Sequence, residues 1–171
     1  GVNYPNAGAE MAFQVFNPYE TDPVLGVINE GIRPHSGKQF LASFAKENSS
    51  VYNNDFIISP ELSFAKDFTF KFFAKSFNED YGREKMNAGY STTGKAADNF
   101  TWLNGENPVE LPMGEWTEYR YTVPAEAKYV AINCVSDYLL FMMVDDVFVG
   151  YELPDGVDPD NIPVSYTHLR A

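Results

Sequence analysis

Apolar and polar residues alternate along short segments of this chain, and clusters of turn-forming residues separate the segments. The segment 67–77, DFTFKFFAKSF, places Phe68, Phe70 and Phe72 on one side, as expected of a strand with one buried face. The segment 116–124, WTEYRYTVP, alternates in the same way. Nowhere does an apolar period of 3.6 residues last beyond two helical turns. The pattern therefore predicts a protein built mainly of strands.

Six further segments have the length and composition of strands. They are 12–16, 38–45, 54–62, 84–93, 127–136 and 138–153. We interpret the last two as a hairpin about Asp137, and NEDYGR at 78–83 as a hairpin-like tip. For 94–105 we expect at most one short helical turn, capped by Asp98 or Asn99. This spacing of short strands is typical of an all-β sandwich of two antiparallel sheets.

The composition fits one well-packed domain. At 171 residues, with 44% hydrophobic and 16% aromatic residues, the chain is long enough for a single core. The net charge of -12 argues against nucleic acid or an anionic membrane as a partner. We expect no membrane span and no signal peptide, since no apolar stretch reaches 18 residues. The single cysteine, Cys134, is expected to be a small core residue.

After Leu153 the composition changes. Three prolines fall within ten residues in 154–171, and no strand pattern continues. We predict a domain over 1–153 and a linker or non-native tail over 154–171. The final stretch VSYTHLRA at 164–171 fits nothing upstream.

Two adjacent acids interrupt the apolar run LLFMMVDDVFV at 139–149. A buried carboxylate needs a cation or several hydrogen-bond donors, so Asp145 and Asp146 point to such a partner. Strand alternation would send them to opposite faces, which argues against a catalytic pair of carboxylates. Calcium, which binds six to eight oxygen ligands, suits one of the two. The alternative is that one Asp caps a turn or pairs with Lys or Arg.

Two loops supply further candidates. His35, in PHSGK, has no nucleophile motif or short-spaced metal ligand beside it, so we expect a loop residue that shapes the nearby site. Asn53, Asn54 and Asp55 precede a strand. They are candidates either for capping the strand end or for holding a second ion, and capping is the more common role of such residues.

Aromatic residues in polar surroundings are the candidates for ligand contact, because sugar faces stack on flat rings. Trp102, Tyr81 and Tyr19 lie in such turn-rich stretches. Each could equally fill one end of the sandwich, which is the role that we favour for Trp116.

Several segments together resemble the cleaved adhesin domain, the jelly-roll module repeated in gingipain and haemagglutinin proteins of Gram-negative anaerobes. The matching stretches are MAFQVFNP (11–18), PHSGKQFLASF (34–44), NNDFIISPEL (53–62), YSTTGKAADNFT (90–101), WTEYRYTVPAEAKYVAI (116–132) and FMMVDDVFV (141–149). The sequence departs from the family pattern at Phe56, where Trp is usual, and it lacks the acidic residue that often precedes the first strand.

The resemblance implies a jelly-roll β-sandwich of a secreted or cell-surface protein with structural calcium. Its ligands would be Asp145 or Asp146 with backbone oxygens around Ser36, Gly37 and Lys38. The expected function is non-catalytic adhesion or ligand binding, with a glycan or a host or other extracellular protein as partner. The alternative is a carbohydrate-binding module that serves a glycan-degrading enzyme or surface complex, and an independent enzyme ranks third.

Overall fold

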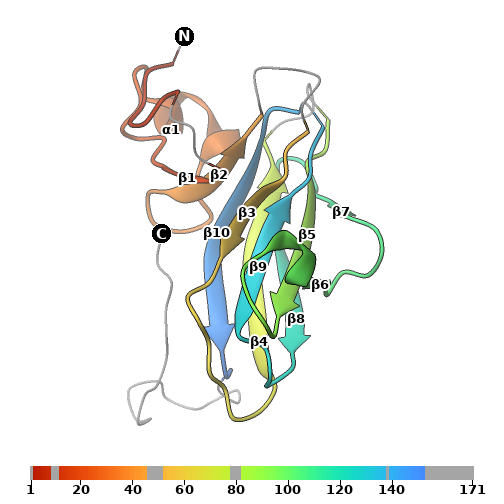
Figure 1. Cartoon of the computed structure of the whole chain (residues 1–171). Helices are drawn as coiled ribbons and strands as arrows, with labels where there is room; N and C mark the ends of the chain where they lie inside the picture. The colour runs from red at the N-terminus through yellow and green to blue at the C-terminus, as the bar shows by residue number, and fades with distance from the viewer. Residues whose placement is uncertain (1, 9–11, 46–51, 78–81, 138, 153–171) are drawn as a thin grey trace, which may run out of the picture.

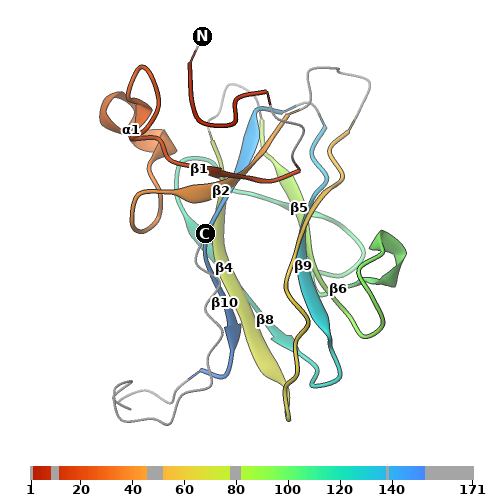
Figure 2. The same ribbon diagram turned by 60° about the vertical axis from the view of Figure 1, so that its left-hand side comes forward.

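Two antiparallel sheets pack face to face in the computed structural model, which describes residues 2–8, 12–45, 52–77, 82–137 and 139–152. The first sheet has the order β1-β2-β10-β4-β8, and the second has the order β3-β9-β5-β6, with β7 also paired to β5. Figure 2 shows the two layers in profile. The fold class predicted from the sequence, a jelly-roll β-sandwich, is confirmed.

The strand bounds agree with the predicted segments to within a few residues. The first sheet contains β1 (Gln14–Phe16), β2 (Phe40–Phe44), β10 (Phe141–Gly150), β4 (Phe68–Ser76) and β8 (Thr117–Val123). The second contains β3 (Asp55–Ile58), β9 (Tyr129–Cys134), β5 (Lys85–Ser91), β6 (Thr101–Trp102) and β7 (Val109–Glu110). The two shortest strands, β6 and β7, were not predicted, because two residues carry no readable alternation.

Among the described residues, three short helices lie outside the sheets: α1 (Leu25–Ile28), η1 (Glu30–Ile32) and η3 (Ala97–Asn99). The helical turn expected within 94–105 is therefore present as η3. Its predicted caps are wrong, since Ala96 occupies the N-cap position without a side-chain hydrogen bond, and Asp98 and Asn99 lie inside the turn. Figure 1 places α1 beside β1 and β2, at one end of the sandwich.

Consecutive strands often cross between the sheets. Strand β9 pairs with β3 and β5, whereas β10 pairs with β2 and β4. The predicted hairpin about Asp137 is therefore wrong, and so is the hairpin-like tip at 78–83, because β4 and β5 belong to different sheets. A polar turn between two strand patterns fits a crossover as well as a hairpin. Because of these crossovers, strands that are neighbours within a sheet are often far apart in the sequence.

The core lies between the two layers. Phe68, Phe70 and Phe72 of β4 point inward and are almost fully buried, together with Ile132 and Cys134 of β9. These inward positions are the ones that strand alternation predicts. Complete burial of a large apolar side chain stabilises the fold by about 1.5–3 kcal/mol. A second, smaller cluster joins β1, β2 and β10 at the end that carries α1, and its members are Phe16, Ile32, Phe40, Ala42, Phe141 and Met143.

A β-bulge interrupts β10 at the two acids. Asp145 lies opposite Phe73 of β4, but Phe148 lies opposite Lys71, so Asp146 and Val147 together face the single residue Phe72. Asp146 has a φ of 48°, in the left-handed region that Asp adopts more readily than most residues. The bulge breaks the alternation on which the opposite-face prediction for Asp145 and Asp146 depended.

The predicted tail at 154–171 lies outside the described residues, as does Leu153. Within the described part of the chain, no helix has the length and apolar character needed to cross a membrane.

Candidate functional site

Trp116 and Lys75 hold the loop from Arg33 to Ser36, and η1 just before it, against the first sheet. Trp116, just before β8, donates a hydrogen bond from Nε1 to the carbonyl oxygen of Arg33 at 3.2 Å. Lys75 of β4 is buried; its Nζ donates to the carbonyl oxygen of Gly31 at 2.7 Å and lies 5.0 Å from the centroid of the Trp116 ring. Burial lowers the pKa of Lys75. These contacts fix the loop beside the bulge of β10.

The buried carboxylate of Asp145 is surrounded by main-chain donors. Its Oδ2 accepts from the backbone N–H groups of His35 at 2.9 Å and Ser36 at 3.1 Å, and its Oδ1 accepts from the N–H of Asp146 at 2.8 Å. Burial raises the pKa of Asp145, and these N–H groups partly offset that effect. Asp145 therefore ties the loop to the sheet, as the capping alternative from the sequence anticipated.

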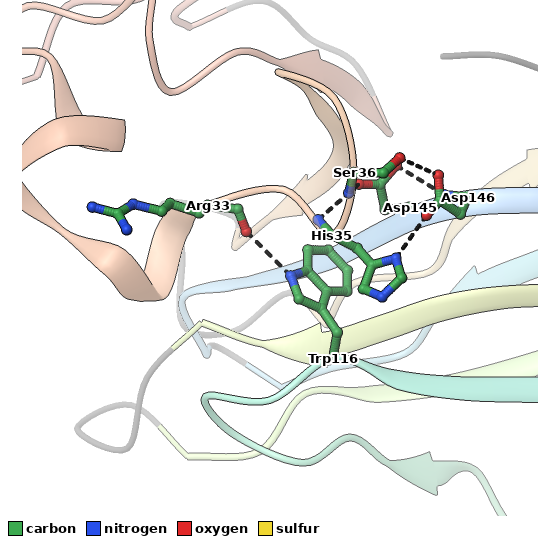
Figure 3. A network of polar contacts seen from close by, with 6 residues as sticks. All are labelled: Arg33, His35, Ser36, Trp116, Asp145 and Asp146. Carbon is green, nitrogen blue, oxygen red and sulfur yellow. Dashed lines mark hydrogen bonds and ion pairs between the residues drawn. The ribbon is translucent and has the colours of Figure 1, made fainter.

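Asp146 contacts the side chains of the same two loop residues. Its Oδ2 lies 2.6 Å from His35 Nδ1, and its Oδ1 accepts from the Ser36 hydroxyl at 2.5 Å (Figure 3). Partial burial acts to raise the pKa of Asp146, but the hydrogen bonds from Ser36 and His35 outweigh it, so the pKa lies below the usual value. The His35 ring also stacks on Phe73, with centroids 3.7 Å apart. His35 is thus the loop residue that shapes the site, as expected.

The bulge explains why both acids reach one loop. In a regular strand, neighbouring side chains point to opposite faces, yet Asp145 and Asp146 each contact both His35 and Ser36 (Figure 3). The pair remains unsuited to acid–base catalysis by two facing carboxylates, because the oxygens of Asp145 are engaged by three N–H groups.

Whether these residues suit a calcium ion depends on which of their oxygens are available. Asp145 fits poorly, since the loop meets it with N–H groups and not with carbonyl oxygens. Asp146 fits better: it is less buried, each of its side-chain oxygens has one partner among the described residues, and the Ser36 hydroxyl is adjacent. No group of three or more His, Cys, Asp or Glu side chains that could hold a metal occurs among the described residues. Any calcium here would therefore depend on main-chain oxygens.

A cleft of about 800 Å³ opens beside the acids, between the edges of the two sheets. Its deep wall is apolar and consists of core residues such as Phe70, Val130 and Val144. Its rim is polar and includes Ser36, Lys38 and Asp146. Strand β2 pairs with β10 only over Phe141–Val144, so within the described residues no strand flanks the second half of β10 on this side. The cleft follows from that gap.

Asn53 and Asp55 form a polar network at the start of β3, whereas Asn54 accepts a hydrogen bond from Asn133 at 3.0 Å. The Asn53 amide donates to Asp55 Oδ2 at 2.8 Å and to the carbonyl oxygen of Phe44 at 3.0 Å, and the Ser43 hydroxyl donates to Asp55 Oδ2 at 3.0 Å. Because Ser43 and Phe44 belong to β2, the network links the two sheets. Its contacts are those of a strand-end cap; the second ion stays a prediction.

The three aromatic candidates lie apart. Tyr19 is exposed near α1, against Gly26, whereas Trp102 lies in β6 of the second sheet, and Tyr81 falls outside the described residues. Trp116, which we expected to be a core plug, packs against the second core cluster. Trp102 is joined by two residues that sequence reasoning missed, Phe56 and Phe100, whose ring centroids lie 6.1 and 6.3 Å from that of Trp102. The Phe-for-Trp departure at position 56 was the one available signal.

Comparison with known proteins shows the fold. The first cleaved adhesin domain of the lysine-specific gingipain from Porphyromonas gingivalis superposes with a TM-score of 0.65 at 18% identity, over 89% of this chain and 90% of that domain. The second such domain gives 0.61 at 20% identity, over 86% and 87%. The resemblance inferred from the sequence is confirmed at the level of structure.

A carbohydrate-binding module of family 61, solved with β-1,4-galactotriose, also shares the fold, with a TM-score of 0.51 at 14% identity over 89% of this chain and 88% of that module. No protein-family model and no curated protein matches the chain. At these identities the similarity establishes the β-sandwich architecture and not the ligand.

Proposed function

We propose that this domain is a non-catalytic adhesion module of a secreted or surface-attached protein, and that the cleft between the sheets binds an extended segment of an extracellular protein. The observation that carries the proposal is the open half of β10, which borders a large apolar cleft with a polar rim. A peptide that lies along an unpaired strand gains main-chain hydrogen bonds, and its alternate side chains enter the cleft.

The geometry of the rim supports this function. Asp145 and Asp146 hold the 33–36 loop at the mouth of the cleft through the contacts described above. A preformed rim loses little conformational entropy when a ligand binds. The gingipain domains with the same fold are named as adhesins, which agrees with a binding role. An apolar cleft with a few convergent polar groups is also the usual form of a binding site.

Binding to immobilised extracellular-matrix proteins tests the proposal. We expect Val147→Arg, which places a charge in the apolar cleft, and Lys38→Glu, which reverses a charge on its exposed rim, each to weaken binding at least about tenfold, a cost of about 1.4 kcal/mol. Biolayer interferometry of the folded variants measures the change.

Val27→Arg is the matched control, because Val27 is exposed on α1 and is not part of the cleft lining. It should bind as the unmodified domain does. Equal binding by all three variants, each with an intact melting transition, would overturn the assignment of the cleft.

The second part of the proposal is structural calcium at the same rim. Asp146 would supply the carboxylate, and the carbonyl oxygens of Ser36, Gly37 and Lys38 would supply main-chain ligands. Calcium bound there would add positive charge beside two acids. Within the part of the chain that the structure describes, each Asp146 side-chain oxygen has one partner, which supports this arrangement, as does the preference of calcium for carboxylate and carbonyl oxygens.

Thermal melting tests the calcium site. At a hundredfold excess over its dissociation constant, an ion that binds only the folded state stabilises it by about 2.7 kcal/mol. This corresponds to roughly 5–10 °C in Tm for a domain of this size. EDTA should reverse the gain, and Asp146→Asn should abolish it while Asp145→Asn retains it. An unchanged Tm of the unmodified domain in millimolar calcium would contradict the site.

Carbohydrate binding is the second candidate function. It is favoured by the aromatic group of Phe56, Phe100 and Trp102 on the second sheet and by the shared fold with a module solved with a galactose oligosaccharide. In that case the domain would hold a glycan near a catalytic partner. Its affinity for the glycan would then depend on the aromatic residues and not on the residues of the cleft.

A further inference from the structure

The outer face of the second sheet carries small residues at its centre. Strand register places Ile58 of β3 opposite Ala131 of β9, Ala131 opposite Gly89 of β5, and Gly89 opposite Trp102 of β6. The neighbouring inward positions, including Met86, Ala88 and Ile132, belong to the core. Alternation therefore puts this row on the outer face, on the side where Figure 2 shows η3 and β6.

Three aromatic rings gather over these small residues. A Cβ atom on Gly89 would lie only 2.6 Å from Cε3 of Trp102, so one face of the indole rests directly on the backbone of β5. The rings of Phe100 and Trp102 are nearly parallel, at 14°, and Phe56 completes a triangle with centroid distances of 5.8, 6.1 and 6.3 Å. Neither core cluster includes Phe56, Phe100 or Trp102. We call these three residues the aromatic patch.

Two buried amides adjoin the aromatic patch. Asn133 lies opposite both Phe56 and Asn87 in the strand register, so all three share the outer face. Asn87 accepts a hydrogen bond at Oδ1 from Asn104 at 3.1 Å, and Asn133 donates from Nδ2 to Asn54 at 3.0 Å. Within the described part of the chain, Nδ2 of Asn87 and Oδ1 of Asn133 have no partner, although both residues are more than nine-tenths buried. A buried amide normally has its hydrogen bonds satisfied.

The unpartnered atoms and the rings match the chemistry of a sugar. A hydroxyl group both donates and accepts, so neighbouring hydroxyls complement one N–H donor and one carbonyl acceptor. The apolar face of a pyranose ring stacks on an aromatic ring. The net charge of -12 disfavours an anionic glycan.

We propose that the aromatic patch, with the amides of Asn87 and Asn133, is a binding site for neutral pyranose glycans. The inference rests on the second candidate function, carbohydrate binding, and assigns its residues. Trp102 supplies the stacking surface and Phe56 extends it, whereas the buried ring of Phe100 packs beside the indole. The two amides bind hydroxyl groups. The site lies on the opposite side of the second sheet from the core.

Isothermal titration with neutral xylo-, cello- and galacto-oligosaccharides tests the site after an array selects those that bind. Trp102→Ala should lower the affinity at least tenfold and Phe56→Ala about three- to tenfold. Asn87→Asp, which removes the unpartnered donor, should lower it as well. Tyr19→Ala is the matched aromatic control and should leave the affinity unchanged. Melting curves confirm that each variant is folded.

Direct contact between the sugar and Trp102 can be measured by fluorescence quenching. In a Trp116→Phe background, Trp102 is the single tryptophan, so the sugar should protect its fluorescence from acrylamide quenching. Protection in that background, which Asn87→Asp weakens, separates contact from a purely structural effect.

These experiments distinguish two claims: that the domain binds carbohydrate, and that the aromatic patch is the binding site. If a neutral glycan binds but Trp102→Ala and Phe56→Ala retain full affinity, while Val147→Arg abolishes binding, carbohydrate binding stands and the aromatic patch is the wrong site. If no neutral oligosaccharide binds at millimolar concentration, both are overturned, and the protein-binding role of the cleft is still judged by its own variants.

Discussion

At the scale of single residues, Glu84 is the described group whose burial most affects how the stability of the domain depends on pH. It precedes β5, is almost fully buried, and has its pKa raised to about 7 by desolvation, against the opposing effect of hydrogen bonds from Ser136 and Leu140. The unfolded chain would ionise this carboxyl near pH 4.5. The folded state therefore holds the proton more tightly than the unfolded state does.

We expect Glu84 to cost stability as the pH rises. Below about pH 4.5 both states are protonated and there is no penalty; between 4.5 and 7 the penalty grows, and above 7 it is complete. At 1.36 kcal/mol per pKa unit the full penalty is about 3 kcal/mol. Glu84→Gln should therefore be more stable than the unmodified domain at pH 8.

Urea denaturation at pH 4 and pH 8 checks this expectation. The difference between Glu84→Gln and the unmodified domain should be large at pH 8 and should vanish near pH 4. Glu110→Gln, at an exposed position, serves as the control. If the two proteins differ in the free energy of unfolding by the same amount at both pH values, burial does not raise the pKa of Glu84.

At the same scale, the role of Asp145 as an acceptor for three backbone N–H groups can be tested by substitution. Asp145→Ala would leave the N–H groups of His35, Ser36 and Asp146 without an acceptor, and each buried unpaired group costs about 1–3 kcal/mol where water cannot reach it. We expect a loss of at least about 2 kcal/mol in the free energy of unfolding from urea denaturation. Asp145→Asn keeps an acceptor oxygen and should lose less. Equal losses would contradict the role of the carboxylate as a cap.

At the scale of elements, the strands could be predicted and their partners could not. Alternation around Phe68, Phe70 and Phe72 identifies β4 because one face of the strand is buried. A turn such as the one at Asp137 looks the same whether the next strand stays in the sheet or crosses to the other one. The bulge between Asp145 and Phe148 could not be predicted from the sequence either. It is defined by the register of β10 with β4, where two residues of β10 face one residue of β4.

The sites were predicted unevenly for the same reason. The contact between Asp145 and the 33–36 loop joins residues about 110 positions apart, and only the family resemblance pointed to it. Phe56 and Trp102 meet through the register of four strands, β3, β9, β5 and β6, which no local pattern encodes. Trp102 was singled out from its turn-rich surroundings, but its partners required the sheet.

The pairing of β5 with β6 gives a test at this scale. Gly89→Ala places a Cβ atom 2.6 Å from the Trp102 ring and 2.9 Å from the carbonyl oxygen of Thr101. Since the backbone cannot yield as a side chain can, we expect a loss of about 1–3 kcal/mol in the free energy of unfolding and a red shift of Trp102 emission. Gly94→Ala, which meets the Asn99 side chain at 3.2 Å, should cost less.

At the scale of the whole molecule, two candidate surfaces belong to different parts of the sandwich. The cleft lies between the sheet edges, and the aromatic patch lies on the outer face of the second sheet. Both sit on a protein whose acids outnumber its bases by 24 to 12. This charge repels anionic partners over about 10 Å at 0.1 M salt, so it acts on both surfaces at once.

Salt should therefore change binding according to the charge of the ligand. For a sulfated oligosaccharide we expect the affinity to rise between 20 and 300 mM sodium chloride, because screening reduces repulsion by the net charge of -12. Its neutral counterpart should bind equally at both concentrations. Titration calorimetry of the matched pair measures the difference. Binding of the sulfated ligand that weakens with salt would instead reveal a local cationic site, such as one around Lys38, that overrides the charge of the whole molecule.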